Sequence, residues 1–196
     1  MTFHLAGHLA DELSKQLSWH WEFQFRPRLD GLTDDEYFWE PVGGSWSVHP
    51  RGQGRTELQD GSGDFTVDYA YPPPQPAPVT TIAWQFAHLL VGIFGERNAR
   101  HFGAPAVDLR SYDYPGTAAE ALTDLDARYD TWITGVRGLT DAELEAACGE
   151  PGFEQDPMIG LVLHIHREVI HHGAMISSLR DLWANGAGRP GGPLPR

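Results

Sequence analysis

The chain has 196 residues, of which 41% are hydrophobic and 21% charged, and these proportions are typical of one globular domain with a substantial core. Its formal net charge of −13 excludes nucleic acid and anionic membranes as expected partners, because both are bound by clustered positive charge. A single cysteine, Cys148, excludes an internal disulfide and a thiolate-rich zinc site. With no base visibly arranged beside it, we expect this cysteine to be a bystander.

The first predicted helix runs from Phe3 to about Arg26, where Pro27 marks its end. Apolar residues recur along it at helical spacing, at Leu5, Leu9 and Leu13. His8 and Glu12 form an i, i+4 pair at the edge of this apolar face. We expect that pair to be solvated or hydrogen-bonded rather than to bind a metal.

A Gly/Pro-rich stretch from Val42 to Val79 follows, and its composition excludes a long helix. Within it, alternating apolar residues between Phe65 and Tyr71 indicate a short extended segment. The aromatic residues of this insertion favour an ordered loop that docks on the rest of the chain. His49 lies in this loop, and we do not count it as a metal ligand.

Two further long helices are predicted over Thr80–His101 and over Thr117–Val136, each beginning at a threonine that can cap it. The last long helix spans Leu161–Leu182, and the tail Gly186–Arg196 is Gly/Pro-rich and expected to be flexible. The sequence therefore predicts an all-α four-helix bundle. We expect a single domain over residues 1–185, with an irregular insertion at 42–78.

The last helix carries the strongest functional signal. Its apolar stripe includes Leu161, Ile165, Ile176 and Leu179, and the same stripe holds Glu168 and His172. These two residues are i, i+4 neighbours on one helical face. Because a buried charge is costly unless it is paired or ligated, the placement predicts either a shared metal ion or a buried ion pair.

A metal ion bound by two residues one turn apart on a helix needs a further ligand from a facing helix. His88 is the leading candidate for this ligand. His88, Glu168 and His172 would form a set of two histidines and one carboxylate, which suits a divalent ion such as zinc, nickel or iron. A histidine on an apolar face is also common as a hydrogen-bonded core residue, so both alternatives remain open on spacing alone. Neighbouring side chains are expected to support the ligands or to contact substrate, namely His164, His171, Gln85 and Trp84.

Two other features of the last helix concern a di-iron site and His166. Glu168 and His171 match the Glu-x-x-His element of di-iron bundles, but the chain contains no second such element. His166 is predicted to point away from the ligand face and to be solvated.

The residues Trp46-Ser47, Thr81-Ile82-Ala83-Trp84 and Ala87-His88-Leu89 resemble the DinB-like superfamily of metal-binding four-helix bundles. The resemblance runs from the first helix to about Trp183. Many members carry His-x-x-x-His in the last helix, whereas this chain has Glu168 at the first position and His172 at the second. The Glu-x-x-x-His form is used by the branch of mycothiol-dependent maleylpyruvate isomerase and related bacterial thiol S-transferases.

That resemblance implies that His88, Glu168 and His172 bind the metal. It further implies a metal-dependent thiol S-transferase or an isomerase-like enzyme, in which a low-molecular-weight thiol such as mycothiol coordinates the metal and attacks a small electrophile as its thiolate. Metal coordination does deprotonate thiols, so this chemistry is physically sound. The residues do not identify the electrophile.

Two alternatives belong to other functional classes. The first is a stress-response bundle that holds a metal or a small ligand without turnover. The second is a structural or dimerisation domain with a buried Glu–His pair, and a homodimer would suit a bundle of this size. The chain has no apolar run of the roughly 18 residues that a membrane helix needs, and its first residues do not resemble a signal peptide. We therefore expect a cytoplasmic protein with a small-molecule substrate.

Overall fold

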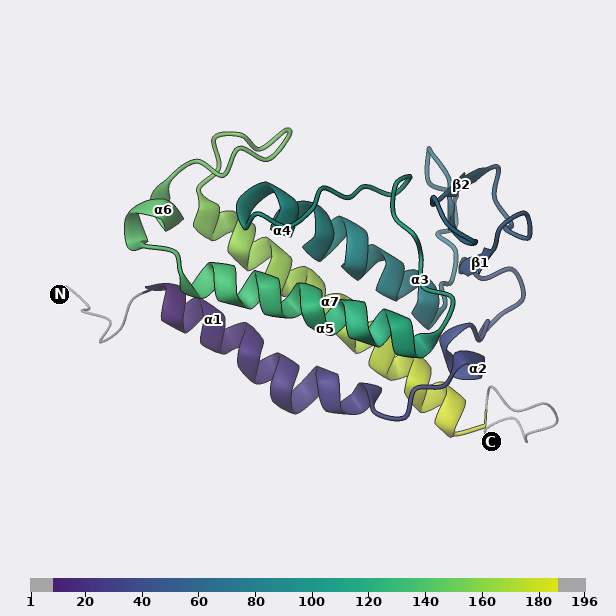
Figure 1. The fold of residues 1–196 in the computed structure, drawn as a ribbon. Helices are drawn as coiled ribbons and strands as arrows, with labels where there is room; N and C mark the ends of the chain where they lie inside the picture. The colour runs from purple at the N-terminus through teal and green to yellow at the C-terminus, as the bar shows by residue number, and fades with distance from the viewer. Residues whose placement is uncertain (1–8, 187–196) are drawn as a thin grey trace.

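The computed structural model of the protein describes residues 9–186, and helices make up most of them (Figure 1). The first half of the chain contains the α-helix α1 (Leu9–His20), the π-helix η1 (Trp21–Phe25), the 3₁₀-helix η2 (Arg26–Leu29) and the short helix α2 (Asp34–Tyr37). The second half contains α3 (Ile82–Ala87), the π-helix η3 (His88–Gly95), α4 (Glu96–His101), α5 (Ala118–Arg137), α6 (Asp141–Glu145) and α7 (Met158–Ala184).

Threonine caps begin several of these helices. Thr81 accepts a hydrogen bond from the Trp84 amide at the start of α3, and Thr117 accepts one from the Glu120 amide at the start of α5. These bonds satisfy amide groups that have no partner within the helix, so they fix where each helix begins. The caps predicted from the sequence at these two helices are therefore confirmed.

The first helical run passes the proline that was predicted to end it. Pro27 occupies the first turn of η2, where its missing amide hydrogen is not needed, so the chain stays helical to Leu29. The predicted end at Arg26 is therefore wrong by about one turn. The predicted start at Phe3 and the residue His8 lie outside the described residues.

The 42–78 insertion, predicted to be irregular, contains a small antiparallel sheet. Its strands are β1 (Val48–Pro50), β2 (Leu58–Asp60) and β3 (Phe65–Tyr69), in the order β1-β3-β2. The extended segment predicted from Phe65 is confirmed as the central strand. Strands of three residues between glycine-rich turns are too short to show alternation, which is why the other two were missed.

A buried aspartate holds this sheet together. The carboxylate of Asp68 is fully buried and lies 2.9 Å from Nε2 of His49. It also accepts hydrogen bonds from the backbone amides of Ser47 and Arg55, and these contacts lower its pKa against the opposing effect of burial. His49 therefore has a structural partner, as expected for a histidine that is not a ligand. A parallel bridge between Trp46 and Thr80 then joins the sheet region to the start of α3.

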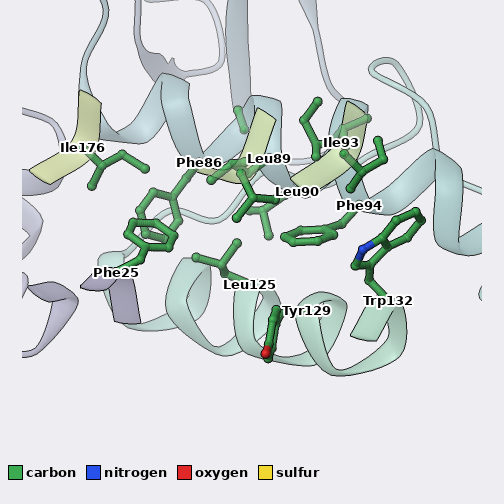
Figure 2. Close-up of a cluster of buried hydrophobic side chains, with 14 of the residues drawn as sticks. Phe25, Phe86, Leu89, Leu90, Ile93, Phe94, Leu125, Tyr129, Trp132 and Ile176 are labelled. Carbon is green, nitrogen blue, oxygen red and sulfur yellow. The ribbon is translucent and has the colours of Figure 1, made fainter. Parts of the chain in front are cut away.

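The hydrophobic core lies between the run α3–η3–α4, helix α5 and helix α7. Figure 2 shows Leu125 and Trp132 of α5 facing aromatic and aliphatic side chains of α3 and η3, among them Phe86 and Phe94. Helix α1 and η1 pack on α5, where Trp21 stacks on Tyr129 with ring centroids 3.9 Å apart. The predicted helical class is confirmed, with the small sheet as a correction to the all-α expectation.

The four-helix-bundle arrangement and the single domain over residues 1–185 remain predictions. Within residues 9–186, no helix combines the length and the apolar character needed to cross a membrane. The predicted flexible tail lies, from residue 187 onward, outside the described residues.

The prediction that His166 is solvated is wrong, because its side chain is 1% exposed. Helix α7 contacts α1 as well as η3, so two of its faces are covered. The single apolar stripe in the sequence had predicted only one covered face. The His166 ring packs edge-on against Trp132, and its Nδ1 atom lies 3.4 Å from Oε1 of Gln16. Its Nε2 atom has no hydrogen-bond partner among the described residues, and burial lowers the pKa of His166 to about 4.

Replacing His166 with phenylalanine is expected to make the protein less sensitive to acid. As the pH falls below about 6.5, His166 becomes protonated in the unfolded chain. In the folded chain it stays neutral down to about pH 4. The free energy of unfolding therefore falls, by roughly 1.5 kcal/mol between pH 7.5 and pH 5.5. Urea unfolding at both pH values should show the stability difference, variant minus wild type, rising by that amount as the pH falls. A pH-independent difference would contradict the assignment.

Candidate metal centre

The three residues predicted as ligands meet between η3 and α7. His88 is the first residue of η3, Glu168 and His172 lie one turn apart on α7, and one donor atom from each falls within 4.8 Å of the others. Nε2 of His172 is 3.5 Å from Oε2 of Glu168, and the ring centroids of the two histidines are 4.5 Å apart. In a tetrahedral zinc site, donor atoms are about 3.4 Å apart, which the separation of Glu168 and His172 matches.

Burial favours the neutral form of both histidines. Burial lowers the pKa of His88 to about 4, and the nearby His172 adds to this effect while Glu168 opposes it. Burial also lowers the pKa of His172 to about 4, with a smaller contribution from His171. Neutral rings at pH 7 offer a lone pair to a metal ion but cannot form an ion pair with Glu168. The two rings and the carboxylate could therefore hold a metal ion together.

Gln85 fixes the orientation and the tautomer of His172. The Gln85 amide nitrogen donates to the Thr80 hydroxyl at 2.6 Å, so its carbonyl oxygen faces His172. Nδ1 of His172 lies 2.5 Å from this oxygen and must carry the proton that is donated to it. Nε2 is left as the acceptor nitrogen, on the side of Glu168. Metal-binding histidines usually donate their other N–H in this way.

Trp84 and Gly92 are neighbours of the His88 ring. The Trp84 indole stacks on the His88 ring with centroids 5.8 Å apart and planes 8° from parallel. Its Nε1 donates to the backbone oxygen of Asp68 in β3 at 3.0 Å, so the indole is itself anchored. A Cβ atom at Gly92 would lie 3.4 Å from Nδ1 of His88, so the Gly92 backbone borders the ring. The π-helical geometry that begins at His88 is often found at functional sites.

His164 and His171 differ in how they relate to the three residues. Nδ1 of His164 lies 3.7 Å from Oε1 of Glu168 and accepts a hydrogen bond from Arg167 at 2.6 Å. The exposed His171 packs its ring against His172, with centroids 5.1 Å apart, and reaches only the outer side of the site. Of these two predicted neighbours, His164 therefore contacts the carboxylate directly.

Two arginines beside the site were not predicted. Nε of Arg167 lies 3.8 Å from Oε1 of Glu168, and Nη1 of Arg97 donates to the backbone oxygen of Gly92 at 2.5 Å. The position of Arg167 next to Glu168 in the sequence was an available signal. Arg97 is nine residues after His88, and its place near the site depends on the π-helix, which no residue pattern indicated.

A family model described as the DinB superfamily matches residues 58–176, which is more than half of the chain and includes all three candidate ligands. The chain belongs to the DinB superfamily. Members of the DinB superfamily often bind a divalent metal, and the His88, Glu168 and His172 cluster could hold such an ion. The DinB match begins in β2 and ends in α7, so it leaves out α1. Searches of the curated proteins and of the solved structures found no match.

Proposed function

We propose that this DinB protein is a metal-dependent enzyme that activates a low-molecular-weight thiol, of the mycothiol type, towards a small electrophile. His88, Glu168 and His172 would hold the divalent ion, which is zinc, nickel or iron. The observation that supports the proposal is the convergence of two neutral histidines and one carboxylate within 4.8 Å. A DinB-like four-helix bundle and a cytoplasmic location, where small thiols are kept reduced, are parts of the same proposal.

A divalent ion at this site supplies Lewis acidity, which lowers the pKa of a bound thiol or water. The side chains do the remaining work of orientation. Gln85 keeps Nε2 of His172 free of its proton, and Trp84 fixes the plane of His88. Arg167 places its positive charge 3.8 Å from the second carboxylate oxygen of Glu168.

Metal analysis of protein purified without an affinity tag tests the site directly. The wild-type protein is expected to carry about one divalent ion per chain, and the His172→Ala variant should carry almost none because it loses one ligand of three. A wild-type protein without stoichiometric metal would refute the proposal.

Thiol chemistry needs its own test. Metal-loaded protein is expected to consume a mycothiol-type thiol in the presence of a suitable member of a broad electrophile panel, and the His172→Ala protein should not. Metal binding without any consumption of thiol would leave the non-catalytic alternative, a metal-binding bundle.

Replacing Gln85 with leucine is expected to weaken metal binding about 10- to 100-fold, because His172 loses the acceptor that fixes its tautomer. Competition with a chromophoric chelator measures this affinity. The matched control is Gln53→Leu, since Gln53 is exposed in the insertion and should leave the affinity unchanged. Equal affinities for the Gln85→Leu variant and the wild type would show that Gln85 only fills space.

A further inference from the structure

One face of helix α7 is exposed along most of its length. The helix contacts α3 and η3 on one side and α1 and η1 on another, while a third face points to solvent. Exposed residues recur on this third face about every 3.6 positions, which is the period of an α-helix. They are Gly160, Leu163, Arg167, His171, Ala174 and Ser178. We call this surface the outer face of α7.

The outer face carries more apolar surface than the solvent-facing side of a helix usually does. Leu163 is 46% exposed, Met175 38% and Leu182 48%. A groove of about 500 Å³ lies along the second half of the face, between Met175 and Leu182 on α7 and the exposed Val79. Exposed apolar side chains that gather on one surface are typical of an interface with another protein, whereas scattered ones are not.

The two ends of the outer face carry opposite charges. Arg167 lies seven residues before Ala174 and Asp181 lies seven residues after it, so each is about 10 Å from Ala174 along the helix axis. The side chain of Arg167 is 70% exposed and that of Asp181 is 66% exposed. His164 accepts a hydrogen bond from Nη2 of Arg167, and Arg28 donates one to Oδ1 of Asp181. Nη1 of the arginine and Oδ2 of the aspartate make no hydrogen bond among the described residues, so each charge can take a further partner.

These charges are self-complementary about a twofold axis. If two copies of the chain place their α7 helices antiparallel with the axis at Ala174, Arg167 of each copy lies opposite Asp181 of the partner subunit. The two Arg167 side chains are then about 20 Å apart and do not repel each other strongly. Ala174 and Ser178 near the centre have small side chains, so the two helices can approach closely. Charge complementarity therefore favours a second copy of this chain as the partner.

We propose that the outer face of α7 is the interface of a homodimer, in which two α7 helices pack antiparallel about Ala174. The partner would fill the groove beside Met175 and cover the exposed His171, whose ring packs against His172. Dimerisation would in this way cover the outer side of the candidate metal centre. The interface depends on neither the metal nor the thiol chemistry, so it can fail without the proposed function failing.

Sedimentation velocity of the full chain over a concentration series tests the interface. A chelator is present throughout, so that a bridging metal cannot link two chains. The wild type is expected to be a dimer at about 10 μM. Ala174→Arg should weaken the dimer at least about 100-fold, because two arginines would meet at the twofold axis. The matched control is Ala127→Arg, at an exposed position of α5, which should dimerise like the wild type.

A charge exchange tests the antiparallel pairing. Arg167→Asp and Asp181→Arg are each expected to weaken the dimer about tenfold, since each variant turns two attractions into repulsions. The combined variant should regain the wild-type affinity, because opposite charges face each other again. Within one chain the two residues are about 20 Å apart, so only a contact between two copies can produce this recovery.

Three results would overturn the proposal. The first is a wild type that stays monomeric up to about 100 μM, which would leave the outer face to a different partner. The second is equal affinity for Ala174→Arg and the wild type, which would place the interface on another surface. The third is a combined charge variant that dimerises no more tightly than either single variant, which would exclude the antiparallel pairing.

Discussion

Replacing Glu168 with glutamine is expected to remove almost all of the stability that zinc gives to the protein. A carboxylate ligand contributes charge as well as a donor atom, so its loss should weaken metal binding by at least the 10- to 100-fold typical of outer contacts. At a zinc concentration of about 100 times Kd, the wild type gains about 2.7 kcal/mol in its free energy of unfolding. A variant with 100-fold weaker binding would gain only about 0.4 kcal/mol.

Urea unfolding of tag-free protein with zinc and with a chelator measures this difference. The glutamine side chain is nearly the same shape, so the unfolding curves of Glu168→Gln and wild type should nearly coincide in chelator. Glu57→Gln is the matched control, since Glu57 is exposed in the insertion. If zinc stabilises the Glu168→Gln protein as much as the wild type, the ion binds elsewhere.

Replacing Trp132 with alanine is expected to lower the free energy of unfolding by about 3–5 kcal/mol, through lost burial and the cavity left behind. Trp132 of α5 is completely buried (Figure 2). It packs against Phe102 with ring centroids 5.4 Å apart. Its indole N–H has no hydrogen-bond partner among the described residues, so the loss is one of packing alone. Domains of this kind are stable by only about 5–15 kcal/mol, which makes the change a large fraction of the total.

Urea unfolding followed by far-UV circular dichroism measures the effect without depending on tryptophan fluorescence. Trp19→Ala is the matched control, because Trp19 is 57% exposed on α1 and should change stability by about 0.5 kcal/mol or less. Similar losses for the two variants would mean that the core does not depend on Trp132.

The long helices could be predicted closely from the sequence, because their signals are local. Helix α5 was predicted from Thr117 to Val136 and spans Ala118–Arg137, since a cap and an apolar repeat mark both ends. Helix η3 shows the opposite case. Almost every side chain from His88 to Gly95 is buried, so the sequence has no polar face that reveals the helical period, and the π-helix was missed.

In the candidate site, too, local relations could be predicted from the sequence and long-range packing could not. Glu168 and His172 could be paired from their spacing, because neighbours on one helix are fixed by the helical repeat. His88 could be proposed but not placed, since its distance from α7 depends on packing between elements 80 residues apart. Gln85 and Trp84 were predicted as neighbours and do contact the two histidines. Arg97 and the burial of His166 depend on the same long-range packing and were not foreseen.

The small sheet is connected to both imidazole rings of the candidate metal centre. One connection runs from the Trp46–Thr80 bridge through Gln85 to His172, and the other runs from the Asp68 carbonyl through Trp84 to His88. Metal binding and the local opening of β3 are linked equilibria. If these connections strengthen metal binding, then metal binding must stabilise β3 against local opening by the same free energy. Metal binding should therefore slow the exchange of amide hydrogens in a strand that contributes no ligand. The insertion and the candidate metal centre are therefore expected to stabilise each other.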